Sequence, residues 1–180
     1  LAQVEVPSFP DTETTLAEHL EAQVGPAAPD PATAFIARQL IGLLDEAGYL
    51  TAELAHVAAS HDVPLAQVER ALAVVQGLDP TGVGARSLAE CLALQAREAD
   101  RYDPCMAALL DHLDLVARGA FPQLKRICGV DDEDLADMLA ELRGYDPRPG
   151  LKFGGGEGAP VVPDILITRA PGNGWDIQLN

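Results

Sequence analysis

Basic side chains are scarce in this chain of 180 residues. Twelve lysines and arginines stand against 28 aspartates and glutamates, which leaves a formal net charge of −16 at pH 7. This balance opposes binding to DNA, RNA or anionic membranes, because those partners need positive charge on the protein. It favours a basic surface on a protein partner, although solubility alone would also account for an acidic composition.

Aromatic residues and long apolar runs are also rare. Aromatics make up 4% of the chain, whereas hydrophobic residues, mainly Leu and Ala, make up 48%, which is typical of a helical protein. No apolar run approaches the roughly 18 residues that a membrane span needs. No basic residue precedes Arg38, so no signal peptide is visible. The three cysteines are odd in number and fit no short motif, which indicates a reducing compartment and predicts a cytoplasmic protein.

Residues with catalytic or metal-binding chemistry are sparse as well. His56 and His61 are five residues apart, which places them on different helix faces, and no third ligand follows at a metal-site spacing. The run Gly154-Gly155-Gly156 resembles a phosphate loop only in composition, because no Lys-Ser or Lys-Thr follows it. We therefore predict no catalytic, cofactor-binding or metal-binding residues and no enzymatic activity. A metal-dependent hydrolase that uses the two histidines is the enzymatic alternative.

What the chain does contain is a series of helical patterns. They predict an all-α fold of two helical subdomains with repeated helix-turn-helix-like units, plus a short C-terminal β-hairpin or irregular tail. We divide the chain into an extended acidic leader (1–14), an N-terminal subdomain (15–102), a C-terminal subdomain (103–150), and a Gly/Pro linker that begins a further module (151–180). The chain opens without methionine and stops in mid-pattern, which predicts a fragment, and we expect this fragment to be monomeric.

Helix starts are marked by capping residues. Thr15 with Glu18 fits a capping box, and both Asp30-Pro31 and Asp103-Pro104 pair an N-cap with a proline at the first helical position. We expect the helix that begins at Pro31 to run to Gly48, and the helix that begins at Pro104 to run to Gly119. The first of these would bury a broad face that includes Phe35, Ile36, Leu40, Leu43 and Leu44.

A pattern of two short helices followed by Gly-X-Asp-Pro occurs twice, 67 residues apart, without a gap. The first copy holds Val57, Val63, Val68, Leu72, Val75, Gly77, Asp79 and Pro80; the second holds Leu124, Val130, Leu135, Leu139, Leu142, Gly144, Asp146 and Pro147. This is the outline of a duplicated helix-turn-helix unit, and chance similarity between two amphipathic hairpins is the alternative.

Charge argues against DNA reading by these units. Residues 131–143, where a recognition helix would lie in the second unit, carry six acidic residues and only Arg143 as a base. Each carboxylate would meet phosphate repulsion where binding needs cations. A packing or protein-binding role is therefore the better interpretation.

The most distinctive stretch is LDPTGVGARSLAECLALQ, residues 78–95. Asp79-Pro80 stops the preceding helix, and Gly82 and Gly84 supply backbone conformations that other residues resist. Ser87 is a plausible N-cap for a helix whose Leu88, Cys91 and Leu92 should face a core.

This stretch resembles the DP-GVGAR-L-ECL-LQ segment of bacterial sigma-54 transcription factors. LDEAGYL (44–50), YDPRPG (145–150) and VVPDILI (161–167) are similar to other segments of that family, in the right order and spacing, although Tyr145 and Asp146 depart from its usual Leu and Asn. The resemblance implies a core-binding domain that anchors the factor to RNA polymerase core, mainly its beta and beta-prime subunits. An ATP-hydrolysing activator and promoter DNA would be partners only through other parts of the full factor.

The resemblance directs attention to the turn as a partner-binding site. We predict contacts through Asp79, Pro80, Gly82, Val83, Gly84 and Arg86. Gly82 and Gly84 have a purely structural alternative, and Arg86 either braces the turn or contacts the polymerase. The functional alternative is an acidic helical adaptor that binds proteins unrelated to polymerase.

Overall fold

The computed structural model describes residues 14–153 and the two strands 165–170 and 174–179. The leader, apart from residue 14, and residues 154–164, which include Gly154 to Gly156, lie outside the described residues. The helices are α1 (Leu16–Ala27), α2 (Pro31–Ile41), α3 (Leu54–Ser60), α4 (Leu65–Gln76), α5 (Leu88–Glu98), α6 (Pro104–Asp111), α7 (Leu113–Ala117), α8 (Phe121–Cys128), α9 (Asp132–Gly144) and the 3-10 helix η1 (Pro149–Lys152). None of the helices in these described ranges is long and apolar enough to cross a membrane. The all-α prediction is confirmed.

The predicted C-terminal hairpin is also present. Strands β1 (Ile165–Ala170) and β2 (Gly174–Leu179) pair antiparallel, with Ile165 opposite Leu179 and Ala170 opposite Gly174.

Local hydrogen bonds explain where the helices begin. The Thr15 and Glu18 side chains form a reciprocal capping box at α1, and the Asp30 carboxylate accepts the Thr33 amide at α2. Ser87, Asp103 and Asp131 cap α5, α6 and α9 in the same way. Each of these side chains satisfies an amide at the helix start that has no partner within the helix.

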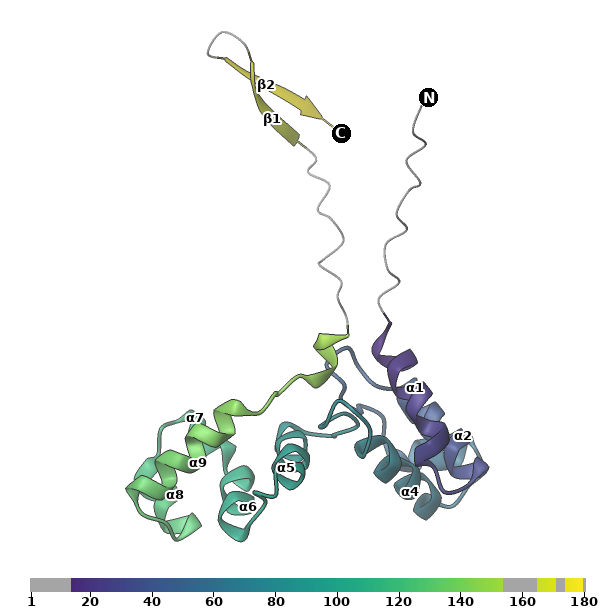
Figure 1. The fold of residues 1–180 in the computed structure, drawn as a ribbon, viewed down its shortest axis with the longest axis vertical. Coiled ribbons are helices and arrows are strands. Elements are labelled where there is room, and N and C mark those ends of the chain that lie inside the picture. The colour runs from purple at the N-terminus through teal and green to yellow at the C-terminus, as the bar shows by residue number, and fades with distance from the viewer. Residues whose placement is uncertain (1–13, 154–164, 171–173, 180) are drawn as a thin grey trace, which may run out of the picture.

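Two apolar clusters form the interior of the helical part of the chain that the structure describes. The first gathers buried residues between Leu20 and Val83, and the second gathers buried residues between Leu92 and Leu135. Helix α5 supplies Leu92, Ala93 and Ala96 to the second cluster, although it lies within the predicted N-terminal subdomain of residues 15–102. The subdomain boundaries stay a prediction. Figure 1 shows α1, α2 and α4 gathered on one side and α6 to α9 on the other. Helical periodicity shows that α5 has a buried face, but it does not show which cluster covers that face.

The predicted repeat corresponds to matching helices. Shifting α3 by 67 residues places it within α8, and the same shift places α4 within α9. Two pairs of equivalent apolar residues are buried in both copies: Val57 and Leu124 are 3% and 0% exposed, and Val68 and Leu135 are 0% and 3% exposed.

The repeat extends to the helices that precede each predicted pair. Helices α1 and α5 both carry the pattern LAE-X-L-X-X-Q after a Thr or Ser cap, 72 residues apart. Asp30-Pro31 at α2 likewise matches Asp103-Pro104 at α6. We therefore define a first unit, residues 15–80, and a second unit, residues 87–147, built on one four-part plan.

Several details of the helix predictions were wrong. Helix α2 ends at Ile41 rather than Gly48, since residues 44–50 form a turn closed by a bridge between Leu44 and Leu50. The helix expected from Pro104 to Gly119 is broken at His112, where the backbone leaves the helical region.

Three residues expected to face a core are instead on the surface. Phe35 is 50% exposed, Leu43 is 43% exposed and Leu88 is 44% exposed. Helical spacing predicts which residues share a face of the helix, but a residue on that face is buried only if another element covers it. These three residues are not covered in this way.

Candidate functional site

The three sequence segments that carry the family resemblance within residues 14–153 meet at one junction between the two units. The Gly84 amide donates to the Gly48 carbonyl at 2.8 Å, and the Leu50 amide donates to the Ala85 carbonyl at 2.9 Å. The Gly150 amide donates to the Ala47 carbonyl at 3.0 Å. Residues 44–50 therefore form the centre, with the 78–86 turn and the 145–150 segment bound to it.

Side chains also hold the last segment in place. The Tyr49 hydroxyl donates to the Pro147 carbonyl at 2.7 Å, across 98 positions of sequence. The Gln95 side chain pairs with the backbone of Asp146, donating to its carbonyl at 2.7 Å and accepting its amide at 2.8 Å. These contacts bind the end of the second unit to residues of both units.

The same glutamine arrangement occurs in the first unit. The Gln23 side chain donates to the Asp79 carbonyl at 2.8 Å and accepts the Asp79 amide at 2.9 Å. In each unit, a glutamine from the first helix thus holds the Asp-Pro that follows the last helix. The recurring LAE-X-L-X-X-Q pattern is the sequence signal for this pair of glutamines, whose role was not predicted.

Two glycines permit close approach at the junction. Gly82 has φ +104°, and a Cβ atom there would lie 2.8 Å from Cys91 Sγ and 3.0 Å from Gln95 Nε2. A Cβ at Gly150 would lie 2.6 Å from the Glu46 carbonyl oxygen, which is backbone and has little freedom to move. Packing and backbone conformation therefore both require glycine at position 82.

Arg86 is bound to Glu90. Its Nη2 and Nε donate to the two Glu90 carboxylate oxygens at 2.7 and 3.0 Å, and its backbone amide donates to Glu90 Oε2 at 2.7 Å. Burial would raise the pKa of Glu90, but the hydrogen bonds from Arg86 and Gln76 outweigh it and hold that pKa below its ordinary value. The Arg86 side chain is nevertheless 56% exposed, so bracing the turn leaves part of this side chain accessible.

Burial divides the six predicted partner-binding residues. Pro80, Gly82, Val83 and Gly84 are buried in the junction. The Asp79 side chain is 77% exposed and also lies 3.3 Å from His19 Nε2. Of the six predicted residues, Asp79 and Arg86 are therefore the two that a partner can reach in this conformation. The partner-binding role of the six residues stays a prediction.

The junction holds no set of reactive groups. Burial raises the pKa of the Cys91 thiol, which disfavours the nucleophilic thiolate, and burial likewise raises the pKa of Tyr49. No cluster of three or more His, Cys, Asp or Glu side chains that would suit a metal ion occurs within the described part of the chain. The arrangement there is suited to holding two helical units together.

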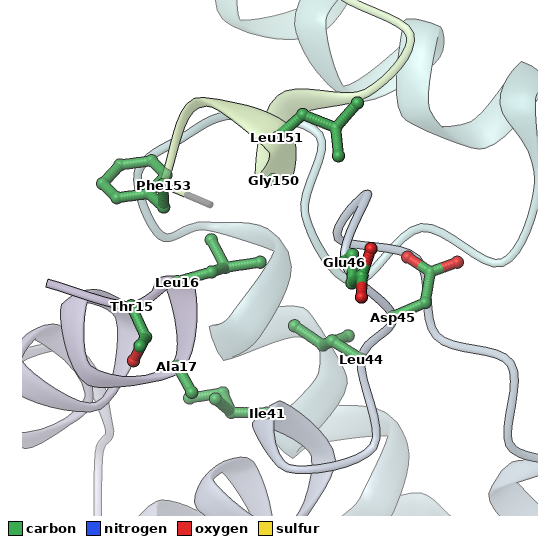
Figure 2. A pocket seen from close by; sticks show the side chains of 10 residues that line it. All are labelled: Thr15, Leu16, Ala17, Ile41, Leu44, Asp45, Glu46, Gly150, Leu151 and Phe153. Carbon is green, nitrogen blue, oxygen red and sulfur yellow. The ribbon is translucent and has the colours of Figure 1, made fainter. Parts of the chain in front are cut away.

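A cavity of about 440 Å³ lies beside the junction, between the start of α1 and the end of η1. Figure 2 shows Leu16, Ile41, Leu44 and Phe153 around it, with the carboxylates of Asp45 and Glu46 to one side. This lining offers neither a nucleophile paired with a base nor a set of convergent donors. The cavity lies between the first turn of α1 and the 3-10 helix η1, so residues from both ends of the helical region line it.

Comparison with known proteins identifies the family. The family described as "Sigma-54 factor, core binding domain" matches residues 5–180. The chain belongs to this family. An RNA polymerase sigma-54 factor of Azorhizobium caulinodans is 54% identical over 177 residues, which cover 96% of this chain and 34% of that protein. Those of Caulobacter vibrioides and Rhizobium etli are 46% and 44% identical, over 92% and 99% of this chain.

The chain spans about a third of the length of these sigma-54 factors, as the 34% coverage of the Azorhizobium protein illustrates. The predicted resemblance is thus confirmed at the level of the family. Within this core-binding domain, the family-like segments 44–50, 78–95 and 145–150 are those that build the junction.

Proposed function

We propose that this chain is the module by which a sigma-54 factor is anchored to RNA polymerase core. The observation that carries the proposal is the junction: the segments that resemble the family are far apart in sequence and are hydrogen-bonded to one another in space. Together with the match over residues 5–180, this supports a scaffold that presents a binding surface rather than a reaction site. The alternative of an adaptor unrelated to polymerase finds no support in the comparisons.

The acidic composition supports a basic partner surface. A net charge of −16 favours approach to positive regions of the polymerase and disfavours direct contact with the DNA phosphates. Within the turn, we assign partner contact to Asp79 and Arg86, because their side chains are 77% and 56% exposed. Pro80, Gly82, Val83 and Gly84 are buried, so we assign them the role of fixing the backbone that positions Asp79 and Arg86.

The proposal extends to the whole factor as follows. The beta and beta-prime subunits of the polymerase core are the direct partners of this domain. An activator ATPase and promoter DNA act through other parts of the factor. The domain works as a monomer in the cytoplasm and needs no cofactor.

The first test is binding of the purified chain to bacterial RNA polymerase core while the salt concentration is varied. We expect saturable binding that weakens as salt rises, since screening reduces attraction between an acidic surface and a basic one. Circular dichroism of the same sample shows that the chain is folded. A folded chain that does not bind the core at low salt would overturn the proposal.

Arg86→Ala distinguishes contact from bracing. A brace predicts a lower thermal midpoint, because the two side-chain hydrogen bonds to Glu90 are lost. A contact predicts weaker polymerase binding with an unchanged midpoint. Glu90→Gln serves as the matched control, since it weakens the brace and leaves the guanidinium in place.

A further inference from the structure

An open groove of about 770 Å³ lies beside Arg86, between the segment that precedes α3 and the starts of α4 and α5. We call it the Leu65–Leu88 groove. It is lined by residues 49–55, Leu65, Glu69, Arg86, Ser87 and Leu88.

The groove exposes apolar side chains. Leu65 and Leu88 are each 44% exposed, and Leu54 is half-buried beside them. Apolar side chains grouped in a concave, open surface are a recurrent feature of sites that bind a partner. Two of these leucines come from different units, so the groove depends on how the units are joined.

The repeated architecture shows that folding does not require a leucine at position 65. Leu65 is the first residue of α4, and its equivalent, 67 residues further on, is Asp132, the first residue of α9. The Asp132 side chain is 86% exposed. The same position in the same local structure thus accepts a charged side chain, and an acidic residue suits a helix start better than a leucine does.

Charge around the groove is negative. Glu53 and Glu69 line it, and neither forms an ion pair within the described residues. The one cationic side chain of the lining, Arg86, is neutralised by both carboxylate oxygens of Glu90. A partner that offers apolar groups flanked by Lys or Arg would therefore match the groove in polarity and in charge.

We propose that the Leu65–Leu88 groove receives a segment of the RNA polymerase core in which an apolar side chain is flanked by Lys or Arg. The apolar side chain packs against Leu65 and Leu88, and the basic side chains face Glu53 and Glu69. Apolar burial and charge complementarity then act together at one contact. The inference rests on the proposed function and names where on the domain the contact is made.

The double variant Leu65→Ala with Leu88→Ala tests the apolar part. We expect its affinity for RNA polymerase core to fall at least tenfold with little change in thermal midpoint, because both side chains are partly exposed in the free domain. The matched control is Leu43→Ala with Leu151→Ala, since these leucines are 43% and 47% exposed and lie outside the groove. The control should bind within twofold of the parent.

If the double variant loses stability, Leu65→Gln, which keeps side-chain length and helix propensity, replaces it.

The variant Glu53→Gln with Glu69→Gln tests the charged part. We expect weaker binding at low salt and a shallower dependence on salt, whereas Glu133→Gln with Asp137→Asn on α9 should bind more like the parent. A parent chain that binds the core together with groove variants that bind equally well would overturn the groove and leave the proposed function standing. A parent chain that does not bind would overturn both.

Discussion

The two units share one plan but differ in how much of it they bury. Helix α4 of the first unit buries Val68, Ala71, Leu72 and Val75, whereas its equivalent α9 buries only Leu135. Leu139 and Leu142, the equivalents of Leu72 and Val75, are half-buried. The same local pattern thus gives the same helices, but fewer residues of the helix are buried in the second unit.

The reason lies in what covers each helix. Helix α4 packs against α1, α2 and α3 and is also covered by the 78–85 turn, which contributes Leu78 and Val83 to the first cluster. Helix α9 turns Asp132, Glu133, Asp134 and Asp137 to solvent. Duplication of a pattern therefore does not duplicate stability, because burial depends on neighbouring elements that the two copies do not share.

The largest expected difference between the units is in the cost of truncating equivalent leucines. Leu72→Ala should lower the free energy of unfolding by about 3 kcal/mol, because Leu72 is 4% exposed and its loss leaves a cavity. Leu139→Ala should cost about 1 kcal/mol, because that side chain is only half-buried. Urea denaturation followed by circular dichroism measures both. Equal costs would mean that the second core is as well packed as the first.

The junction should be nearly as sensitive at Gly82. Gly82→Ala should cost about 2 kcal/mol, since it strains a backbone with φ +104° and places Cβ 2.8 Å from Cys91 Sγ. Gly77→Ala is the control, because Gly77 has φ −91° and its nearest neighbour would be 3.5 Å away. Thermal unfolding should show no loss for the control. A stable Gly82→Ala variant would mean that the junction adjusts at little cost.

The two glutamines give a closer comparison. Gln95→Ala should cost about 2 kcal/mol and Gln23→Ala about 1 kcal/mol, because each loses two hydrogen bonds to an Asp backbone and only the Gln95 pair is partly shielded from water. Urea denaturation of both variants, and of the double variant, measures these costs. A larger loss for Gln23→Ala would contradict this ranking.

The smallest effect concerns acid pH. The folded state lowers the pKa of Glu90 below its ordinary value of 4.5, so ionised Glu90 stabilises the fold above pH 4.5. This stabilisation is lost as the pH falls through the lower, folded-state pKa. Glu90→Gln should cost about 1 kcal/mol at pH 7, a figure that allows for the exposure of Arg86, and less at pH 3. Its equivalent Glu18 is fully exposed, so Glu18→Gln should change the pH dependence less. Unfolding at both pH values measures this, and a constant cost for Glu90→Gln would contradict it.

Much of the fold could be predicted from short-range patterns. Thr15, Asp30, Ser87, Asp103 and Asp131 mark helix starts because their side chains bond to amides three residues away. The Gly-X-Asp-Pro repeat identified the paired helices in both units. The break at His112 and the early end of α2 were missed. After α2 the chain instead forms the turn that the bridge between Leu44 and Leu50 closes, and helical periodicity does not specify this bridge.

The candidate site was predicted less completely. The turn 78–86 was recognised as special, yet four of its six predicted contact residues are buried. Sequence spacing does not indicate whether a glycine or proline lies on the surface or beneath it. Leu88 was expected to face a core, yet it is exposed. Only the tertiary structure shows that Leu88 and Leu65 line one groove.

The sequence by itself determined the helix starts, the repeated pattern and the acidic charge, since each depends on residues within a few positions or on composition alone. The tertiary structure decided which segments meet. Tyr49 reaches Pro147 across 98 positions, and α5 joins the second core although it follows the first. Such contacts are chosen by the burial of apolar faces against one another, and no local pattern in the chain specifies which face meets which.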